Sequence, residues 1–484
     1  MKKTGNWRKL GKNAGQDQTN FQLQGQPVQD STIIIEWLSC PDDLVVQSIK
    51  WQGAEARVLY LEGLVEKSQL ARLLAAERAG PDLRKSADIT EIARELLNGR
   101  TVLLVTGEKE AWLLATSGWE HRQPEQPLAE MVLRGGREGF CEVLKTNLAL
   151  VRRRCLDRQL KVKYISIGSE HQVKIAFLYL NHLVSPSLVR EVEGRLRQVR
   201  LRGIWDSGML ERWLADRRWS PFPQVLATER PDRVGAALAE GRIALLVDGS
   251  PFVLIVPGLF TDFLFSAEDY YIHPILATSV RWIRVLSFMI ALSLPALYIA
   301  LTTFHQEMVP TSLMLSIAAG RSGVPMPAFA EAVMMEVAIE LIREASLRLP
   351  GPMGNTLGVV GALVIGQSAV QAGLVGPILT IIVALTALAT FAIPNYSLAF
   401  SIRLLRFLVM LAAAVMGGFG LTLALGLILA YILQMEVYGI PYALGLFPSS
   451  WRVWDDHLLC IGGEAAGQER FPFKGEVGKG EEQQ

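Results

Sequence analysis

The pattern of hydrophobic and polar positions divides the chain into parts of different character. Between residues 31 and 270, short apolar runs alternate with amphipathic charged stretches, as in the strands and helices of a soluble mixed domain. From residue 271 to 450 the apolar runs become long enough for lipid. Residues 1–30 are rich in Gln, Asn, Gly and Lys and predict a disordered leader, and 451–484 predict a short polar tail. The predicted fold is an α/β soluble half followed by an all-α transmembrane helical domain.

The soluble half contains a weak internal repeat. "RVLYLEGLV" at 57–65 resembles "AFLYLNHLV" at 176–184, and "LLNGRTVLLVTG" at 96–107 resembles "LAEGRIALLVDG" at 238–249. Each unit has the pattern of a strand, a helix, a glycine turn and a second strand. The repeat therefore predicts two similar subdomains.

The subdomains are expected at 31–150 and 151–270, with Gly99 and Gly241 each following the end of a helix. Glycine suits that position because the residue after a helix often adopts a left-handed conformation. Between the subdomains, "REGFCEVLKTNLALVRRRC" has helical periodicity and predicts a connecting helix with a solvated basic end.

About five segments of the second half are candidates to cross a membrane, because each is near the ~20 residues that a bilayer core requires. They are 283–304, 327–349, 356–375, 377–393 and 407–433. The last segment is long enough to tilt strongly or to break at Gly417, Gly418 or Gly420, and the sequence leaves both possibilities open.

Arginines suggest an orientation. If 327–349 is a crossing, three pairs fall on one side, which the positive-inside rule makes cytoplasmic: Arg281 with Arg284, Arg343 with Arg348, and Arg403 with Arg406, taken to precede the last span. The leader lacks the apolar core of a signal peptide, so the N-terminal half is expected to be cytoplasmic too. Five crossings place the C-terminal tail outside. If the last helix is broken, or if the second segment is re-entrant, the tail lies on the cytoplasmic side.

The segment 327–349 differs from its apolar neighbours because it carries charges. On a helical wheel, Glu336, Glu340, Arg343 and Glu344 fall within about 100° of one another and form one stripe. A charge that faces lipid costs at least ~3 kcal/mol, so the stripe needs water, another polar surface or the membrane surface.

Three interpretations of the stripe are open. Local neutralisation has Arg343 reach Glu340 or Glu336, and Arg348 reach Glu344, at helical spacing. A helix lying flat in the interface fits less well, because such helices are usually basic. A water-filled path lined by copies of the stripe suits cations, because its glutamates outnumber its arginine.

The next segment carries small residues in register. Gly354, Gly358, Ala362 and Gly366 recur every four residues. Such a row lets helix backbones approach closely in lipid, where association lacks a hydrophobic drive. We expect this row to be a helix-packing face.

Composition excludes several classes of function. The net charge is +1 and the mean hydropathy is +0.27, which favours a membrane rather than a nucleic acid as partner. The four cysteines form no C-x-x-C pair, and 283–450 contains no Asp or Cys and only His305 among histidines. We therefore expect neither a metal site, a cofactor nor enzymatic activity.

Several stretches identify a family resemblance. "LPALYIALTTFHQEMVPTSL", "VPMPAFAEAVMMEVAIELIREASLRLP" and "GNTLGVVGALVIGQSAVQAGLVGPILTI", with surrounding sequence from about 130 to 435, resemble the A subunits of GerA-type spore germination receptors. The resemblance implies an inner-membrane subunit of a spore that works with a permease-like B subunit and a lipoprotein C subunit. It further implies a response to nutrient germinants, ion release and assembly into a homo-oligomeric channel, and it transfers no catalytic residue.

Two functions follow. The first is a receptor subunit that forms or gates a cation-conducting oligomer, with the soluble half as sensor or coupling module. The alternative is a non-conducting scaffold that supports a permease-like partner. A proton-coupled carrier is less favoured because the membrane block shows no inverted repeat.

Overall fold

The computed structural model describes residues 23–76, 83–116, 127, 130, 134–348, 361, 364 and 366–444. These residues form two compact units, which are described separately. One unit holds the described residues up to 116 together with 143–164 and 176–181, and the other holds the remainder.

The first subdomain is a five-stranded antiparallel sheet with the strand order β1-β2-β4-β5-β3. Its strands are β1 (Leu44–Trp51), β2 (Ala54–Leu61), β3 (Leu83–Ser86), β4 (Thr101–Val105) and β5 (Ala111–Leu114). Its helices are α1 (Pro27–Trp37), α2 (Lys67–Ala76) and α3 (Ile89–Leu97), and α4 (Leu144–Arg154) belongs to the same unit.

Helices cover both faces of this sheet, and successive strand residues point to opposite faces. Leu59 and Val102 pack with α1 and α3, whereas Val58 and Leu103 pack with α2 on the other face. Helix α1 begins at Pro27, earlier than the predicted end of the leader. Its Asp30 is buried and accepts hydrogen bonds from two preceding backbone amides, which orders residues that composition alone assigned to a disordered segment.

The second sheet repeats the first. Its order is β6-β7-β9-β10-β8, which is the order of the first sheet with each strand number raised by five. Its strands are β6 (Leu160–Ile167), β7 (Val173–Leu180), β8 (Leu226–Thr228), β9 (Ile243–Val247) and β10 (Val253–Val256). Its helices are α5 (Pro186–Gln198), α6 (Ser207–Leu214), α7 (Pro231–Ala239) and α8 (Phe260–Leu264). The two predicted α/β subdomains are confirmed.

The turn glycines explain why the repeat was visible in the sequence. Gly99 and Gly241 follow α3 and α7 with φ of 84° and 85°. Left-handed backbone is accessible to glycine without the strain that other residues meet, so both helices end at a glycine as predicted.

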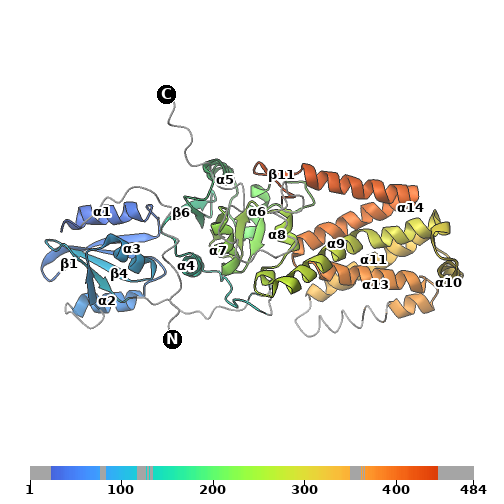
Figure 1. The fold of residues 1–484 in the computed structure, drawn as a ribbon, viewed down its shortest axis with the longest axis horizontal. Helices are drawn as coiled ribbons and strands as arrows, with labels where there is room; N and C mark the ends of the chain where they lie inside the picture. Colours follow the sequence, from blue (N-terminus) through green and yellow to red (C-terminus); the bar gives the residue numbers. More distant parts are fainter. Residues whose placement is uncertain are drawn as a thin grey trace, which may run out of the picture. The chain divides into compact units, whose positions relative to one another are not determined.

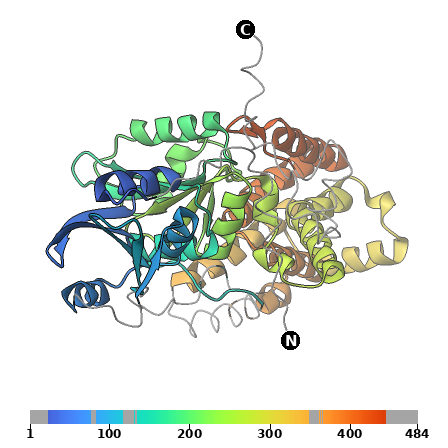
Figure 2. The same ribbon diagram turned by 60° about the vertical axis from the view of Figure 1, so that its left-hand side comes forward.

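The helical half follows the second sheet in the chain and is coloured from yellow-green to red in Figure 1. Its elements are η2 (Ala267–Tyr270), α9 (Pro274–Thr303), η3 (Gln306–Met308), α10 (Thr311–Arg321), α11 (Ala328–Arg348), α13 (Pro377–Phe391), α14 (Tyr396–Gln434), β11 (Glu436–Val437) and β12 (Ile440–Pro441). Helix α9 contacts α11, α13 and α14, and Figure 2 shows the same bundle from a second direction.

Two helices of the described residues, α9 and α14, are long and apolar enough to cross a membrane, and α13 is shorter and apolar. Helix α9 begins nine residues before the predicted span, because Pro274 stands at its first turn and the His273 side chain accepts a hydrogen bond from the Ile275 amide. Of the predicted span 356–375, residues 356–360, 362, 363 and 365 lie outside the described residues, and 366–371 are helical.

Helix α14 is a hairpin of two arms. Gly417 has φ 62° and ψ −139°, which is not helical. Ser401 of the first arm donates to the Pro221 carbonyl, and Tyr431 of the second arm stacks on Phe222 at 6.1 Å between ring centroids. A straight helix would hold residues 401 and 431 about 45 Å apart, so contact with two adjacent residues requires the chain to fold back.

The arms are 396–416 and 418–434, and Figure 1 shows them meeting at one end of the bundle and separating toward the other. Of the two possibilities left open by the sequence, the break is correct, and it occurs at Gly417. A Cβ atom at this position would lie 2.8 Å from Phe304 Cβ, so the turn packs closely on the end of α9.

The segment after the hairpin docks on the second subdomain. The Tyr438 hydroxyl donates to the Leu214 carbonyl at 2.7 Å, and the Tyr442 hydroxyl donates to the Pro223 carbonyl at 2.6 Å. In turn, the Phe260 amide donates to the Tyr442 carbonyl at 3.0 Å. Both ends of α14 are therefore attached to the same subdomain.

One premise of the predicted orientation is corrected. Arg403 and Arg406 do not precede the last span but lie within α14, which begins at Tyr396. The helix starts there because the Asn395 side chain caps it by accepting a hydrogen bond from the Leu398 amide. This pair therefore gives no information about loop charges.

Candidate functional site

The charged stripe of α11 faces α14. Glu336 and Arg406 form a buried ion pair with Oε2 to Nη1 at 2.5 Å, and the two side chains are 2% and 3% exposed. Arg406 also donates to the Ala291 carbonyl and to the Thr390 hydroxyl, each at 2.7 Å. One guanidinium therefore connects α9, α11, α13 and α14.

Glu340 bridges two arginines. Its Oε2 accepts from Arg403 Nη1 of α14 at 2.8 Å, and its Oε1 accepts from Arg343 Nη1 at 3.2 Å. Glu340 is partly exposed, whereas Arg403 is buried. This group continues the interhelical contact outward from Glu336.

Glu344 pairs with Arg348 at 2.6 Å within α11, as the neutralisation interpretation expected. The two side chains are 59% and 78% exposed, so the pair contributes little to stability. It provides a natural control for the buried pairs.

A fourth carboxylate of α11 was not predicted from the sequence. Glu331 of α11 is fully buried, pairs with Arg321 of α10 at 2.8 Å and accepts from the Gly376 amide at 3.2 Å. The sequence did contain a sign of this site, because a single acidic residue in an apolar stretch requires a partner.

The charges of the stripe balance differently from the sequence count. Glu336, Glu340 and Glu344 are matched by Arg343, Arg348, Arg403 and Arg406, so three acids meet four bases. The count on α11 alone omitted the two arginines of α14, which are distant in the sequence. We call the residues Glu336, Glu340, Arg343, Arg403 and Arg406 the α11–α14 charge cluster.

Three of the four residues of the predicted small-residue row, Gly354, Gly358 and Ala362, lie outside the described residues. Gly366 is described and buried, and a Cβ atom there would lie 3.7 Å from Thr380 Cγ2 of α13. At this position the segment is in ordinary van der Waals range of α13.

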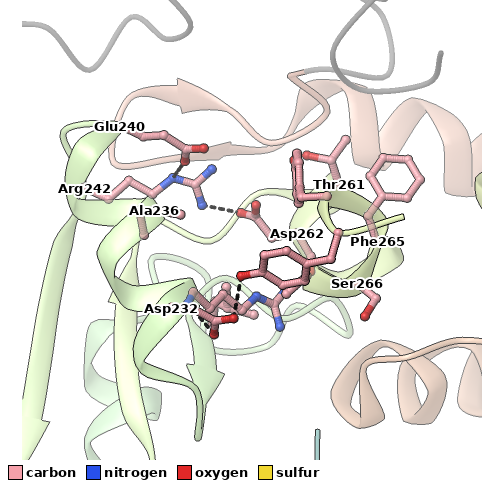
Figure 3. Close-up of a pocket in the computed structure, with 14 residues that line it drawn as sticks. Asp232, Ala236, Glu240, Arg242, Thr261, Asp262, Phe265 and Ser266 are labelled. Atoms are coloured by element: carbon pink, nitrogen blue, oxygen red, sulfur yellow. Dashed lines mark hydrogen bonds and ion pairs between the residues drawn. The ribbon is translucent and has the colours of Figure 1, made fainter. Parts of the chain in front are cut away.

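A second candidate site is a cavity of about 220 Å³ in the second subdomain (Figure 3). Its walls come from α7, α8, η2 and the strand ends beside them. The lining residues are Leu226, Asp232, Arg233, Ala236, Ala237, Glu240, Arg242, Thr261, Asp262, Phe265, Ser266, Ala267, Tyr270 and Tyr271.

The charges of the cavity are paired within the chain. Arg242 contacts Asp262 at 2.5 Å and Glu240 at 3.0 Å, as Figure 3 shows. Burial opposes the charged form of Arg242, but the two carboxylates prevail and raise its pKa above the usual value. Any ligand here would have to exchange with these internal contacts.

Asp232, on the opposite wall, accepts from Arg230 at 2.6 Å and from the Tyr271 hydroxyl at 2.6 Å. Burial would raise the pKa of Asp232, but the hydrogen bonds from Arg230 and Tyr271 lower it below the usual value. The carboxylate is therefore held ionised. These residues could not be recognised in the sequence, because they converge only in the folded chain.

These features define a membrane protein with a duplicated α/β domain in its N-terminal half and apolar helices in its C-terminal half. The family described as Bacillus/Clostridium GerA spore germination protein matches residues 32–461. The chain belongs to the GerA family of spore germination proteins, which confirms the resemblance drawn from the sequence.

Two relatives compared by sequence agree with this assignment. Spore germination protein GerLA of Bacillus cereus is 36% identical over 91% of this chain and 94% of its own length. Spore germination protein KA of Bacillus subtilis (strain 168) is 44% identical over 79% of this chain and 70% of its own length. A crystal structure of the N-terminal domain of the A subunit of the Bacillus megaterium spore germinant receptor GerK3 covers 50% of this chain and 98% of that domain, at 24% identity and a TM-score of 0.39.

Proposed function

We propose that the chain is the A subunit of a spore germination receptor in the spore inner membrane. In this proposal it couples the sensing of a small nutrient germinant to ion release. A permease-like B subunit, a lipoprotein C subunit and further copies of the chain are the proposed partners. The family assignment supports the receptor role, and the duplicated α/β half is proposed to be the cytoplasmic sensor or coupling module.

The α11–α14 charge cluster supports a role for α11 as a gate. Glu336 and Glu340 of α11 are held by Arg406 and Arg403 of α14, so the position of α11 depends on two interhelical ion pairs. Moving α11 away from α14 would expose the carboxylates to water. In an oligomer, rings of these carboxylates would then favour cations. With the pairs closed, the carboxylates are neutralised and the path is proposed to be shut.

A non-conducting scaffold is the second candidate, and the charge balance favours it. Because arginines match the glutamates within one chain, the stripe has no excess negative charge for a passing cation. In that case the cluster would only fasten the helices together, and the B subunit would carry the transport.

Glu340→Gln separates the two candidates. It removes one interhelical ion pair at a partly exposed position, while Glu344→Gln removes an exposed pair within α11 and is the matched control. A gate predicts normal subunit abundance with ion release at a lower germinant concentration or with altered cation preference. A scaffold predicts unchanged release per subunit.

Glu340→Gln leaves buried Arg403 without this partner and could deplete the subunit for that reason alone. The double variant Glu340→Gln/Arg403→Gln removes both charges and controls for this effect. A single variant that is depleted, together with a double variant that regains both abundance and normal release, would contradict the gate. The measurement is cation release from triggered spores, normalised to the amount of subunit in the membrane.

A further inference from the structure

The turn between α6 and β8 presents a tryptophan to the surroundings. Trp219 is 99% exposed, and the preceding residues Arg217 and Arg218 are also exposed. A single exposed apolar side chain is common on protein surfaces, so the exposure of Trp219 is informative only together with the apolar helix surface beside it.

The exposure of Trp219 is built into the turn. The side chain of buried Gln224 donates to the Arg217 carbonyl at 2.8 Å and accepts from the Arg217 amide at 3.0 Å. The Ser220 amide donates to the same carbonyl at 3.0 Å. These bonds fix the backbone on both sides of Trp219, so the indole projects from a closed turn.

The turn lies where the apolar hairpin meets the second subdomain. Pro221 accepts from Ser401, in the second turn of the first arm, and Phe222 stacks on Tyr431, in the last turn of the second arm. Trp219 is only two residues from Pro221. It is therefore placed beside the outermost turns of both arms.

An exposed apolar stripe starts on the same helix end. Phe400, Leu404 and Leu408 are all more than half exposed and are spaced four residues apart along the first arm. Such spacing makes one helix face. In a membrane protein this face meets lipid, so the bilayer boundary lies near the start of the stripe and near Trp219.

The residue types of the turn suit that boundary. Tryptophan is enriched at membrane interfaces because its ring is apolar and its N–H is polar. Arginines near the surface attract anionic headgroups. Arg217 also lies over the ring of Tyr431 at 5.8 Å, which holds its positive charge beside the end of the second arm.

We propose that Trp219, with Arg217 and Arg218, docks in the headgroup layer of the bilayer around the hairpin. The occupant of this surface is anionic phospholipid. The turn then fixes the height of the second subdomain above the membrane. The proposal rests on the hairpin crossing the bilayer and does not depend on whether α11 is a gate.

Lipid quenching tests the docking. The full chain is reconstituted in vesicles of phosphatidylcholine and phosphatidylglycerol that carry bromine either near the glycerol or near the chain ends. The contribution of Trp219 is the difference between the parent protein and Trp219→Phe. We expect loss of most of that emission with shallow bromine and little loss with deep bromine.

Two tryptophans serve as references. Trp282 lies on α9 and is half exposed, so its emission should be quenched if the bundle is in the bilayer. Trp205 is 70% exposed and precedes α6, about 12 Å from the end that contacts Tyr438, so it should not be quenched. Trp282→Phe and Trp205→Phe measure these contributions.

The reference tryptophans show whether a negative result concerns the docking of Trp219 or the insertion of the bundle. Quenching of Trp282 without quenching of Trp219 would overturn the docking while leaving the membrane insertion intact. Emission of Trp219 that changes with protein concentration in detergent, and not with brominated lipid, would assign the surface to a second copy and would also overturn the proposal. Two double variants test the arginines. If Arg217→Lys/Arg218→Lys keeps the quenching by shallow bromine and Arg217→Gln/Arg218→Gln loses it, recognition of anionic headgroups is supported.

Discussion

Arg406 lies 70 residues beyond Glu336 in the sequence, yet its Nη1 is 2.5 Å from the Glu336 carboxylate in the interior of the helical half. Removing one partner of a buried ion pair leaves an uncompensated charge and costs about 3–5 kcal/mol. The position of α11 against α14 therefore depends strongly on this contact.

Arg406→Leu is expected to deplete the subunit from membranes and to lower its thermal stability in detergent. Arg406→Leu combined with Glu336→Leu should recover part of the loss, because no charge is then left unpaired. Glu344→Gln, at the exposed pair, should change the unfolding free energy by less than about 1 kcal/mol. Equal effects of Arg406→Leu and Glu344→Gln would show that the buried pair has no special weight.

Gly417→Ala should destabilise the hairpin. The backbone at Gly417 is in a region that other residues rarely adopt, and the added Cβ would meet Phe304 at 2.8 Å. We expect a loss of at least about 1 kcal/mol, measured by thermal unfolding in detergent. Gly426→Ala in the second arm is the control, since a Cβ there meets nothing within 4 Å. Similar stability of both variants would argue against a fixed turn.

The hairpin predicts the sides of three positions. Ser187 lies at the start of α5 in the second subdomain, and Glu436 follows the second arm, so both should lie on one side of the membrane. Ser312 follows α9 and should lie on the other side. Single cysteines at these positions, in a chain without its native cysteines, can be labelled with a membrane-impermeant reagent. If Glu436→Cys is labelled together with Ser312→Cys and not with Ser187→Cys, the second arm does not bring the chain back to the side of the soluble half.

If the N-terminal half is cytoplasmic, the reagent should label Ser312→Cys in intact cells and leave Ser187→Cys unlabelled. The opposite pattern would preserve the hairpin and reverse the proposed orientation. The experiment thus measures the fold of α14 and the orientation independently.

Stability should fall in acid through Asp232. Its native pKa lies below the ordinary value of about 3.9, so the unfolded chain binds the proton more readily. The stabilisation is present above the ordinary pKa and is lost as the pH falls through the native pKa. Tyr271→Phe removes one hydrogen bond to the carboxylate and should cost roughly 1–2 kcal/mol at neutral pH.

The same variant should reduce the loss of stability between neutral pH and about pH 3, because its Asp232 has a pKa closer to the ordinary value. Asp232→Asn should abolish this part of the pH dependence. Unfolding curves at a series of pH values provide the measurement. A Tyr271→Phe variant with the unaltered pH profile would exclude the hydrogen bond as a cause.

The small-residue row predicts different tolerance at two neighbouring positions. Gly366 is buried near α13, whereas Ser368 is exposed. Gly366→Leu and, by the same argument, Gly358→Leu should weaken helix packing or assembly more than Ser368→Leu. Cross-linking yield and subunit abundance can be compared, and equal yields from all three would contradict a packing role for the row.

The sequence predicted features that depend on local pattern. Gly99 and Gly241 revealed the duplicated subdomain because each repeat needs a left-handed residue at the same place. The stripe of Glu336, Glu340 and Glu344 was visible because helical spacing alone brings these residues to one face. In each case the relevant neighbours are within a few residues.

Contacts between distant segments could not be read in this way. Arg403 and Arg406 were taken to precede the last span, because apolar composition alone does not show that a helix starts at Tyr396. Their partners on α11 are more than 60 residues away, so no periodicity relates them. The break at Gly417 was one of three possible positions, and it was decided by the packing of Phe304 against the turn.

The attachment of α14 at both ends has a mechanical consequence. Ser401 near its start and Tyr438 just after its end bind the same subdomain, through Pro221 and Leu214. A rotation of that subdomain would therefore move the two arms together. The turn at Gly417, which is farthest from the subdomain, would be displaced the most. Phe304, which follows the last residue of α9 and touches that turn, would receive the movement at the far end of the bundle.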